Sequence, residues 1–134
     1  MIQANELRIG NLFAMNDFPM YVEAIFRDTV YLNFEGNEGD VWEEDIKDLV
    51  PIPLTEEILI KAGFEKCRKG YSLNVGGESF DYYIKGEFVL WYHKNKGYSL
   101  DTISKSRDRF YNNLHELQNL IFALTGEEIK IELV

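Results

Sequence analysis

The sequence predicts an α+β fold in one compact domain, residues 1–134. We expect a small SH3-like β-barrel first, then a short connector helix, and then an antiparallel β-meander packed by one long amphipathic C-terminal helix. Three observations support this: strand-like segments separated by turns in the first third of the chain, a proline-interrupted connector, and a late apolar stripe of helical spacing. Residues 1–53 (the barrel) and 54–134 (a helix–sheet–helix unit) are the expected sub-modules.

The predicted barrel rests on short segments that are rich in β-branched and aromatic residues. Four of them are expected as strands: 12–15, 20–26, 29–34 and 41–46. In the second segment, strict alternation places Val22 and Ala24 on one face and Ile25 on the other. The prolines at 51 and 53 then favour a rigid connector.

Both predicted helices carry signals at their ends. Thr55 is a good N-cap for the connector helix, and Gly63 ends it about two turns later. For the C-terminal helix, Ser106 or Asp108 is the expected cap and Gly126 the expected stop. Its apolar stripe follows the 3.6-residue period: Phe110, Leu114, Leu117, Ile121 and Leu124.

The region between the two helices predicts a four-stranded meander. Gly76-Gly77, Lys85-Gly86 and Asn95-Lys96-Gly97 mark hairpin turns. The strands that they join are expected at 71–75, 80–84, 87–93 and 98–103. We expect the C-terminal helix to cover one face of this sheet, with 129–134 as a short edge strand.

The charge of the chain is uneven. The net charge is −9, and all of that excess lies in residues 1–62, because 63–134 balance acidic and basic side chains. A nucleic-acid partner needs a basic face, which only a weak cluster at Lys105, Arg107 and Arg109 suggests, so nucleic-acid binding is disfavoured. With one cysteine and neither a secretion signal nor a membrane-length apolar run, we expect a cytoplasmic protein that avoids membranes.

Residues with catalytic or metal-binding chemistry lack the spacing that such sites need. Cys67 stands among lysine and arginine, which could lower its pKa, yet no motif flanks it. Neither His93 nor His115 belongs to a zinc-binding pattern, and Gly76-Gly77 is no phosphate loop. The sequence therefore predicts no catalytic residue, metal or cofactor.

Candidate partner-binding residues come from three places. Trp42 opens an acidic run, Glu43, Glu44 and Asp45, whose ordinary reading is a solvated face. Tyr83 and Trp91 are aromatic residues that the meander would expose, depending on its register. The polar side of the C-terminal helix carries a third set, which could either meet a partner or cap nearby backbone: His115, Gln118 and Asn119.

Two segments together resemble a known family. They are Glu6-Leu7-Arg8-Ile9-Gly10-Asn11-Leu12 and His115-Glu116-Leu117-Gln118-Asn119-Leu120-Ile121-Phe122-Ala123-Leu124-Thr125-Gly126-Glu127-Glu128, with 49–57 between them. The order and residues of these segments resemble those of a family of small uncharacterised proteins of Bacteroides-type bacteria and their phages and mobile elements. The resemblance implies a bacterial or phage cytoplasmic setting and carries over no catalytic residue.

The function expected from the sequence is a non-enzymatic protein-binding or adaptor module from a phage or mobile element. One alternative is association with nucleic acid, or its reverse, an acidic surface that mimics DNA. Another is an enzyme with an unfamiliar site that joins Cys67 or a histidine to buried carboxylates. Monomer and homodimer both stay open, because the helix stripe could pack on its own sheet or on a second subunit.

Overall fold

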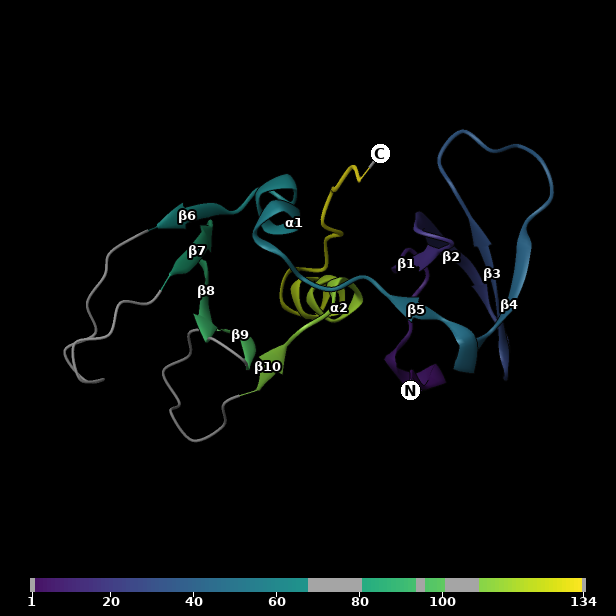
Figure 1. Cartoon of the computed structure of the whole chain (residues 1–134), viewed down its shortest axis with the longest axis horizontal. Helices are drawn as coiled ribbons and strands as arrows, with labels where there is room; N and C mark the ends of the chain where they lie inside the picture. Colours follow the sequence, from purple (N-terminus) through teal and green to yellow (C-terminus); the bar gives the residue numbers. More distant parts are fainter. Residues whose placement is uncertain (1, 68–80, 94–95, 101–108, 134) are drawn as a thin grey trace. The chain divides into compact units, whose positions relative to one another are not determined.

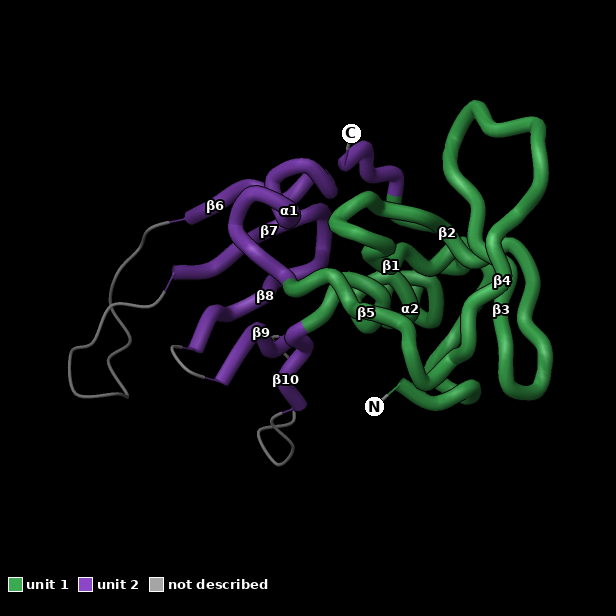
Figure 2. Tube along the Cα trace, turned by 45° about the vertical axis from the view of Figure 1, so that its right-hand side comes forward, with its two compact units in different colours: residues 1–53, 113–129, 134 green, residues 54–112, 130–133 purple. Residues whose placement is uncertain are grey.

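The computed structural model describes residues 2–67, 81–93, 96–100 and 109–133. It confirms an α+β fold of two antiparallel sheets and a long C-terminal helix (Figure 1). The chain forms two compact units (Figure 2). The first unit takes in Met1–Pro53, Asn113–Ile129 and Val134, and the second takes in Leu54–Asn112 and Lys130–Leu133.

The sheet of the first unit has five strands in the order β4-β3-β2-β1-β5 and curls into a half-barrel. Its strands are β1 (Leu12–Met15), β2 (Phe18–Ile25), β3 (Thr29–Asn33), β4 (Trp42–Asp45) and β5 (Val50–Pro51). Two 3₁₀ turns, η1 (Ala4–Glu6) and η2 (Ile46–Asp48), flank the strands. The first four strands fall close to the expected segments, because each carries its own β-type composition between turn residues.

A tight turn and a bulge set the register of this sheet. Asn16 and Asp17 both have positive φ, the geometry of a two-residue hairpin turn that these residue types tolerate well. The pairing of β2 with β3 shifts between Val22 and Ala24. This irregularity brings Ile25 against the core, so the expected alternation was wrong beyond Val22.

The core of the first unit lies on the concave side of the half-barrel. Its buried side chains come from β1, β2, β3, η2 and the flanking segments: Leu7, Phe13, Met20, Val22, Val30, Leu32, Ile46 and Leu49. Burial of an apolar side chain of this size contributes about 1.5–3 kcal/mol each. The curled sheet therefore encloses its own apolar centre.

The long helix α2 (Leu114–Thr125) also belongs to the first unit, where it contacts β1. The sequence also predicts that α2 covers the meander, and that packing stays a prediction. The helix starts at Asn113, where Glu116 Oε1 accepts a hydrogen bond from the Asn113 backbone N–H (3.1 Å) in a capping box. Gly126 ends it in the left-handed conformation, as the sequence predicted.

The helix α2 starts later than expected, so its buried apolar stripe is shorter than the sequence predicted. Leu114, Leu117 and Ile121 are buried as expected, while Leu124 is 55% exposed. Phe110 lies before the helix, in a short strand. A 3.6-residue period continues by chance into neighbouring residues, whereas the capping box at Asn113 marks where the helix begins. The expected caps, Ser106 and Asp108, lie outside the described residues.

The second unit is a meander in the order β10-β9-β8-β7-β6. It contains the helix α1 (Glu56–Lys61) and the strands β6 (Glu65–Cys67), β7 (Tyr82–Lys85), β8 (Phe88–His93), β9 (Gly97–Leu100) and β10 (Phe110–Tyr111). Thr55 caps α1 as predicted, accepting a hydrogen bond from Ile58 N–H (3.2 Å). The polar strand β6 was missed, because its three residues lack a β-type composition.

Several expectations for this region fall on residues that the structure leaves undescribed. They are the strand at 71–75, the Gly76-Gly77 turn, the start of 80–84, Asn95, the end of 98–103 and the cations Lys105 and Arg107. At the other end, the described residues 129–133 form no strand, so the expected edge strand is absent there.

Candidate functional site

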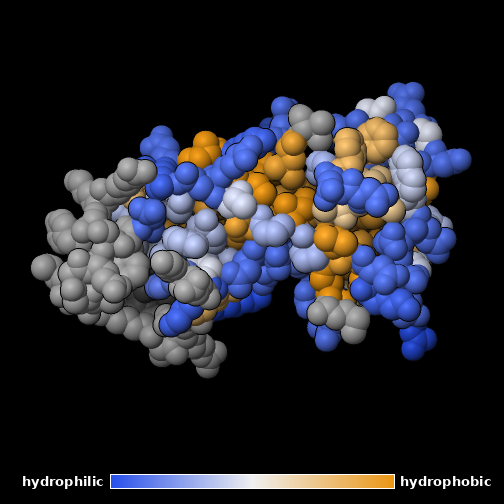
Figure 3. Space-filling model, viewed as in Figure 1, coloured by the Kyte–Doolittle hydropathy of each residue, from blue (hydrophilic) through white to orange (hydrophobic). Residues whose placement is uncertain are grey.

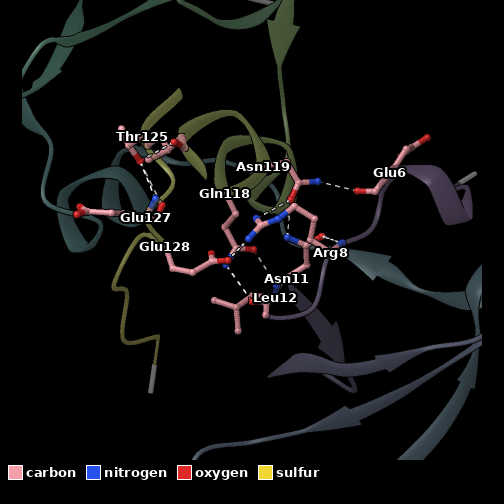
Figure 4. A network of polar contacts seen from close by, with 11 residues as sticks. Glu6, Arg8, Asn11, Leu12, Gln118, Asn119, Thr125, Glu127 and Glu128 are labelled. Carbon is pink, nitrogen blue, oxygen red and sulfur yellow. Dashed lines mark hydrogen bonds and ion pairs between the residues drawn. The ribbon is translucent and has the colours of Figure 1, made fainter. Parts of the chain in front are cut away.

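On the polar side of α2, Gln118 and Asn119 bind backbone (Figure 4). Gln118 is 2% exposed. Its Oε1 accepts a hydrogen bond from Leu12 N–H (2.8 Å), and its Nε2 donates to the Gly10 carbonyl (3.1 Å). One side-chain amide thus takes the place of a neighbouring strand beside the segment that leads into β1.

Asn119 completes the same contact one residue further along the helix. Its Oδ1 accepts hydrogen bonds from Asn11 Nδ2 (2.8 Å) and from an Arg8 guanidinium nitrogen (3.2 Å). Its Nδ2 donates to the Glu6 carbonyl (2.7 Å). Figure 4 shows these side chains pointing from α2 toward the residues before β1. Residues 6–12 and the helix residues Gln118 and Asn119 therefore meet in space.

Arg8 joins a third part of the first unit to this network. Its guanidinium forms an ion pair with Glu128 and lies 3.7 Å from the centre of the Phe122 ring. Charge-assisted hydrogen bonds and cation–π contacts are each worth about 1–3 kcal/mol when partly buried. These contacts make Gln118, Asn119 and Arg8 structural residues that hold α2 to the sheet.

His115 is buried as well, with 2% of its surface exposed. Its ring packs against Phe13 (4.9 Å between centroids), and neither ring nitrogen has a hydrogen-bond partner among the described residues. Glu6 is 3.7 Å from Nε2, which is too far for a hydrogen bond. Burial lowers the pKa of His115, partly offset by the nearby Glu116 and Glu6 carboxylates, so the neutral form is favoured. This side chain offers no free surface to a partner.

The meander separates the two aromatic residues that were expected to share a face. Tyr83 pairs with Leu90, and Trp91 pairs with Tyr82, so Tyr83 and Trp91 point to opposite sides of the sheet. Tyr83 is 3% exposed, and Trp91 is half-buried against Tyr82 (4.9 Å between centroids). With this register, Tyr83 and Trp91 form no shared exposed surface.

Tyr83 is instead part of a polar cluster beside α1. Its hydroxyl donates a hydrogen bond to Glu56 Oε1 (3.2 Å), which also forms an ion pair with Lys66. Burial is the main cause that raises the pKa of Tyr83, and the neighbouring Tyr98 and Glu56 raise it further. The phenol stays protonated and serves as a hydrogen-bond donor within the second unit.

The acidic strand β4 keeps its candidate residues at the surface. Trp42 is 43% exposed, Glu43 and Asp45 are exposed, and Glu44 is half-buried. Trp42 pairs with Leu32, so its indole lies on the concave face of the sheet, at the rim of the core. In Figure 3 the upper right of the molecule shows hydrophilic residues beside a pale hydrophobic patch.

Two further aromatic residues join Trp42, and sequence analysis missed both. The Phe34 ring lies 5.7 Å from the Trp42 ring and 5.5 Å from the Phe18 ring, measured between centroids. Phe18 is 41% exposed, and Phe34 is half-buried against the core. We call Phe18, Phe34 and Trp42 the aromatic row. Hairpin composition around Asn16-Asp17 was the only sequence signal that could have brought Phe18 beside the others.

Outside the aromatic row and the polar contacts of α2, the first unit has a further concave feature among the residues that the structure describes. An open hollow of about 500 Å³ in the first unit is lined by apolar and charged residues of both signs: Ile2, Gln3, Ala4, Arg27, Asp28, Asp45, Ile46 and Lys47. Cys67 is half-buried on β6, and the described contacts bring neither histidine to it. Within the described ranges, no group of three or more metal-ligating side chains gathers, and no helix has the length and apolarity to cross a membrane.

Comparisons with known proteins found no match to a family model, to a curated protein or to a solved structure.

Proposed function

We propose that this chain is a non-enzymatic protein-binding module, and that the aromatic row with the acidic strand β4 is its binding surface. One observation carries the proposal: the Phe34 ring contacts both the Phe18 ring and the Trp42 ring, and the latter two each expose more than 40% of their surface. Exposed, clustered aromatic rings are enriched at protein interfaces, because they bury a large area at a small cost in side-chain entropy.

The shape of the first unit supports this assignment. Five short antiparallel strands in meander order, curled around an apolar core, are compatible with an SH3-like barrel. Fold alone does not define function, so the weight rests on the surface residues. The resemblance to proteins of Bacteroides-type bacteria and their phages supports a cytoplasmic adaptor that acts on a host or phage protein.

The test compares two phenylalanines of the same unit. Phe18→Ala shortens the aromatic row, while Phe26→Ala removes a ring of similar exposure (47%) that contacts Tyr31 and, among the described residues, makes no ring contact with the row. Both variants and the unmodified protein are immobilised, and the proteins captured from a bacterial host lysate, with and without nuclease treatment, are quantified by mass spectrometry. We expect a specific partner that Phe18→Ala loses and Phe26→Ala retains.

Two results would reject the proposal. Equal capture by both variants would show that the aromatic row is not the binding surface. Capture that disappears after nuclease treatment would make nucleic acid the partner. In that case the chain would be a nucleic-acid-associated protein, the first alternative drawn from the sequence.

A further inference from the structure

The strand β4 (Trp42–Asp45) is an unpaired edge of the first sheet. The sheet order places it last, and it pairs with β3 from Thr29 to Leu32. Its other side has no strand partner among the described residues. A free strand edge carries backbone N–H and C=O groups that can receive a further strand. The geometry therefore allows an extended peptide to be added beside Trp42.

The loop that leads into this edge is held in place by two asparagines. Asn33 is buried, and its Oδ1 accepts hydrogen bonds from Phe34 N–H (2.8 Å) and from Asn37 Nδ2 (2.7 Å). Asn37 Oδ1 accepts a further bond from Gly39 N–H (3.1 Å). These bonds fix the position of Phe34 in the aromatic row before any ligand arrives. A surface ordered in advance loses less entropy on binding.

The charge along β4 and the loop before it is negative, while Arg27 and Lys47 lie only at the Asp45 end, in the hollow described above. Residues 28–46 contain seven carboxylates and no lysine or arginine. Among the described residues, none of these carboxylates lies within ion-pair distance of a cation. Glu43 and Asp45 lie on one face of β4, and Glu44 lies on the other, together with Trp42. An added strand would meet negative charge on both of its faces.

Resting on the protein-binding function proposed above, we propose that β4 binds an extended, lysine- or arginine-bearing segment of another protein as an additional antiparallel or parallel strand. Backbone hydrogen bonds to β4 provide the attachment, and cationic side chains meet the carboxylates. On the concave face, a cation or its aliphatic stem packs over the aromatic row, where the ring faces attract positive charge. The acidic strand and the aromatic rings then act together on one ligand.

The same charge argues against other occupants. A second copy of this chain docked edge to edge would bring the acidic β4 strands together, where like charges repel. Nucleic acids and anionic lipid surfaces carry phosphates, which these carboxylates repel in the same way. A basic extended segment is the occupant that both the free edge and the charge favour.

The test uses a synthetic peptide of alternating lysine and valine, with an alternating glutamate and valine peptide as its charge-reversed control. In a Trp91→Phe background, Trp42 is the single tryptophan, so its fluorescence reports binding at β4. We expect saturable binding of the lysine peptide only, weakened by added salt. Hydrogen exchange should slow at residues 42–45, which occurs only if the peptide forms a strand there.

Variants separate the contribution of the aromatic row from that of the carboxylates of β4. We expect Phe18→Ala to weaken the lysine peptide by about tenfold relative to Phe26→Ala, as the loss of a cation–π and apolar contact predicts. The double variant Glu43→Gln/Asp45→Asn should weaken binding of the lysine peptide more than the double variant Glu87→Gln/Glu132→Gln does. The second variant removes the same charge from exposed positions of the second unit.

Three outcomes would overturn the inference. They are the absence of saturable binding of either the lysine peptide or its arginine counterpart at about 1 mM, equal binding of the charge-reversed peptide, and exchange protection elsewhere than 42–45. If one of these occurs while lysate capture still depends on Phe18, the protein-binding function stands and only the basic-strand chemistry fails. If capture fails as well, both proposals fall.

Discussion

The two sides of the first sheet differ in how their outer backbone groups are paired. At one edge, β5 pairs with Phe13 and Ala14 of β1, and the Gln118 amide continues the pairing at Leu12 and Gly10. At the other edge, β4 pairs with β3 alone among the described residues. The outer backbone groups from Gly10 to Ala14 are thus paired by β5 and by a helix side chain, and we call this the closed edge. The outer side of β4 has no strand partner among the described residues, and we call it the open edge.

This difference separates residues that maintain the fold from residues that are available for binding. Polar side chains at the closed edge are buried and face backbone, so their replacement is expected to lower stability. Side chains at the open edge are aromatic or acidic and exposed, so their replacement is expected to leave the fold intact. Charges on an edge strand also protect it against non-specific pairing, which a basic partner strand would overcome.

The largest expected effect is at Gln118, whose side chain connects the closed edge to α2. Gln118→Ala leaves the Leu12 N–H and the Gly10 carbonyl without their partner in a partly buried place. Each unsatisfied buried group costs about 1–3 kcal/mol, so we expect the free energy of unfolding to fall by about 2–4 kcal/mol. Urea denaturation of the full chain measures this change.

The chain offers a matched control for that variant. Gln3 is its only other glutamine, and it is exposed with no side-chain capping bond. Gln3→Ala should change the free energy of unfolding by about 0.5 kcal/mol or less. Equal effects of Gln3→Ala and Gln118→Ala would show that the closed edge does not depend on the glutamine amide.

A smaller loss is expected at Arg8, which is only partly buried. Arg8→Ala removes the ion pair with Glu128, the bond to Asn119 and the contact with Phe122. Because solvent screens an exposed pair, we expect a loss of about 1–2 kcal/mol in the free energy of unfolding. Arg27→Ala, at an exposed position with no ion pair among the described residues, serves as the control. A loss at Arg8 no larger than that at Arg27 would contradict this role.

The buried His115 makes the closed edge sensitive to pH. Its folded-state pKa is lowered, mainly by burial, so the unfolded chain binds a proton more readily. Stability from this residue is therefore complete above the unfolded pKa of about 6.5 and is lost as the pH falls below it. We expect urea midpoints of the unmodified protein to decline from pH 7.5 toward pH 5.5 more steeply than those of His115→Phe.

The comparison with His115→Phe isolates the imidazole. Both proteins keep the neighbouring Glu6 and Glu116 and every other carboxylate, so their acid sensitivity is otherwise shared. Phenylalanine also preserves the ring that packs against Phe13. If the stability of the two proteins changes with pH in parallel over this range, protonation of His115 is not coupled to folding.

The parts of the fold that sequence predicted are those coded locally. Thr55 caps α1 and Gly126 stops α2 through bonds to residues within one turn. The closed edge was out of reach, because Gln118 and Leu12 are 106 positions apart and no nearby residue marks their pairing. Trp42 was identified from its acidic context, while Phe18 and Phe34 became its neighbours only through the register of three strands.

The smallest expected effect on stability is at the open edge. Trp42→Ala removes a ring that is 43% exposed and contacts Phe34, so nearly half of its surface is already in water. We expect the free energy of unfolding to fall by about 1 kcal/mol, because the burial term scales with the area removed from water. Urea denaturation beside Gln118→Ala tests this directly. A Trp42→Ala loss as large as that of Gln118→Ala would mean that the aromatic row supports the fold, and the contrast between the two edges would no longer argue for binding at β4.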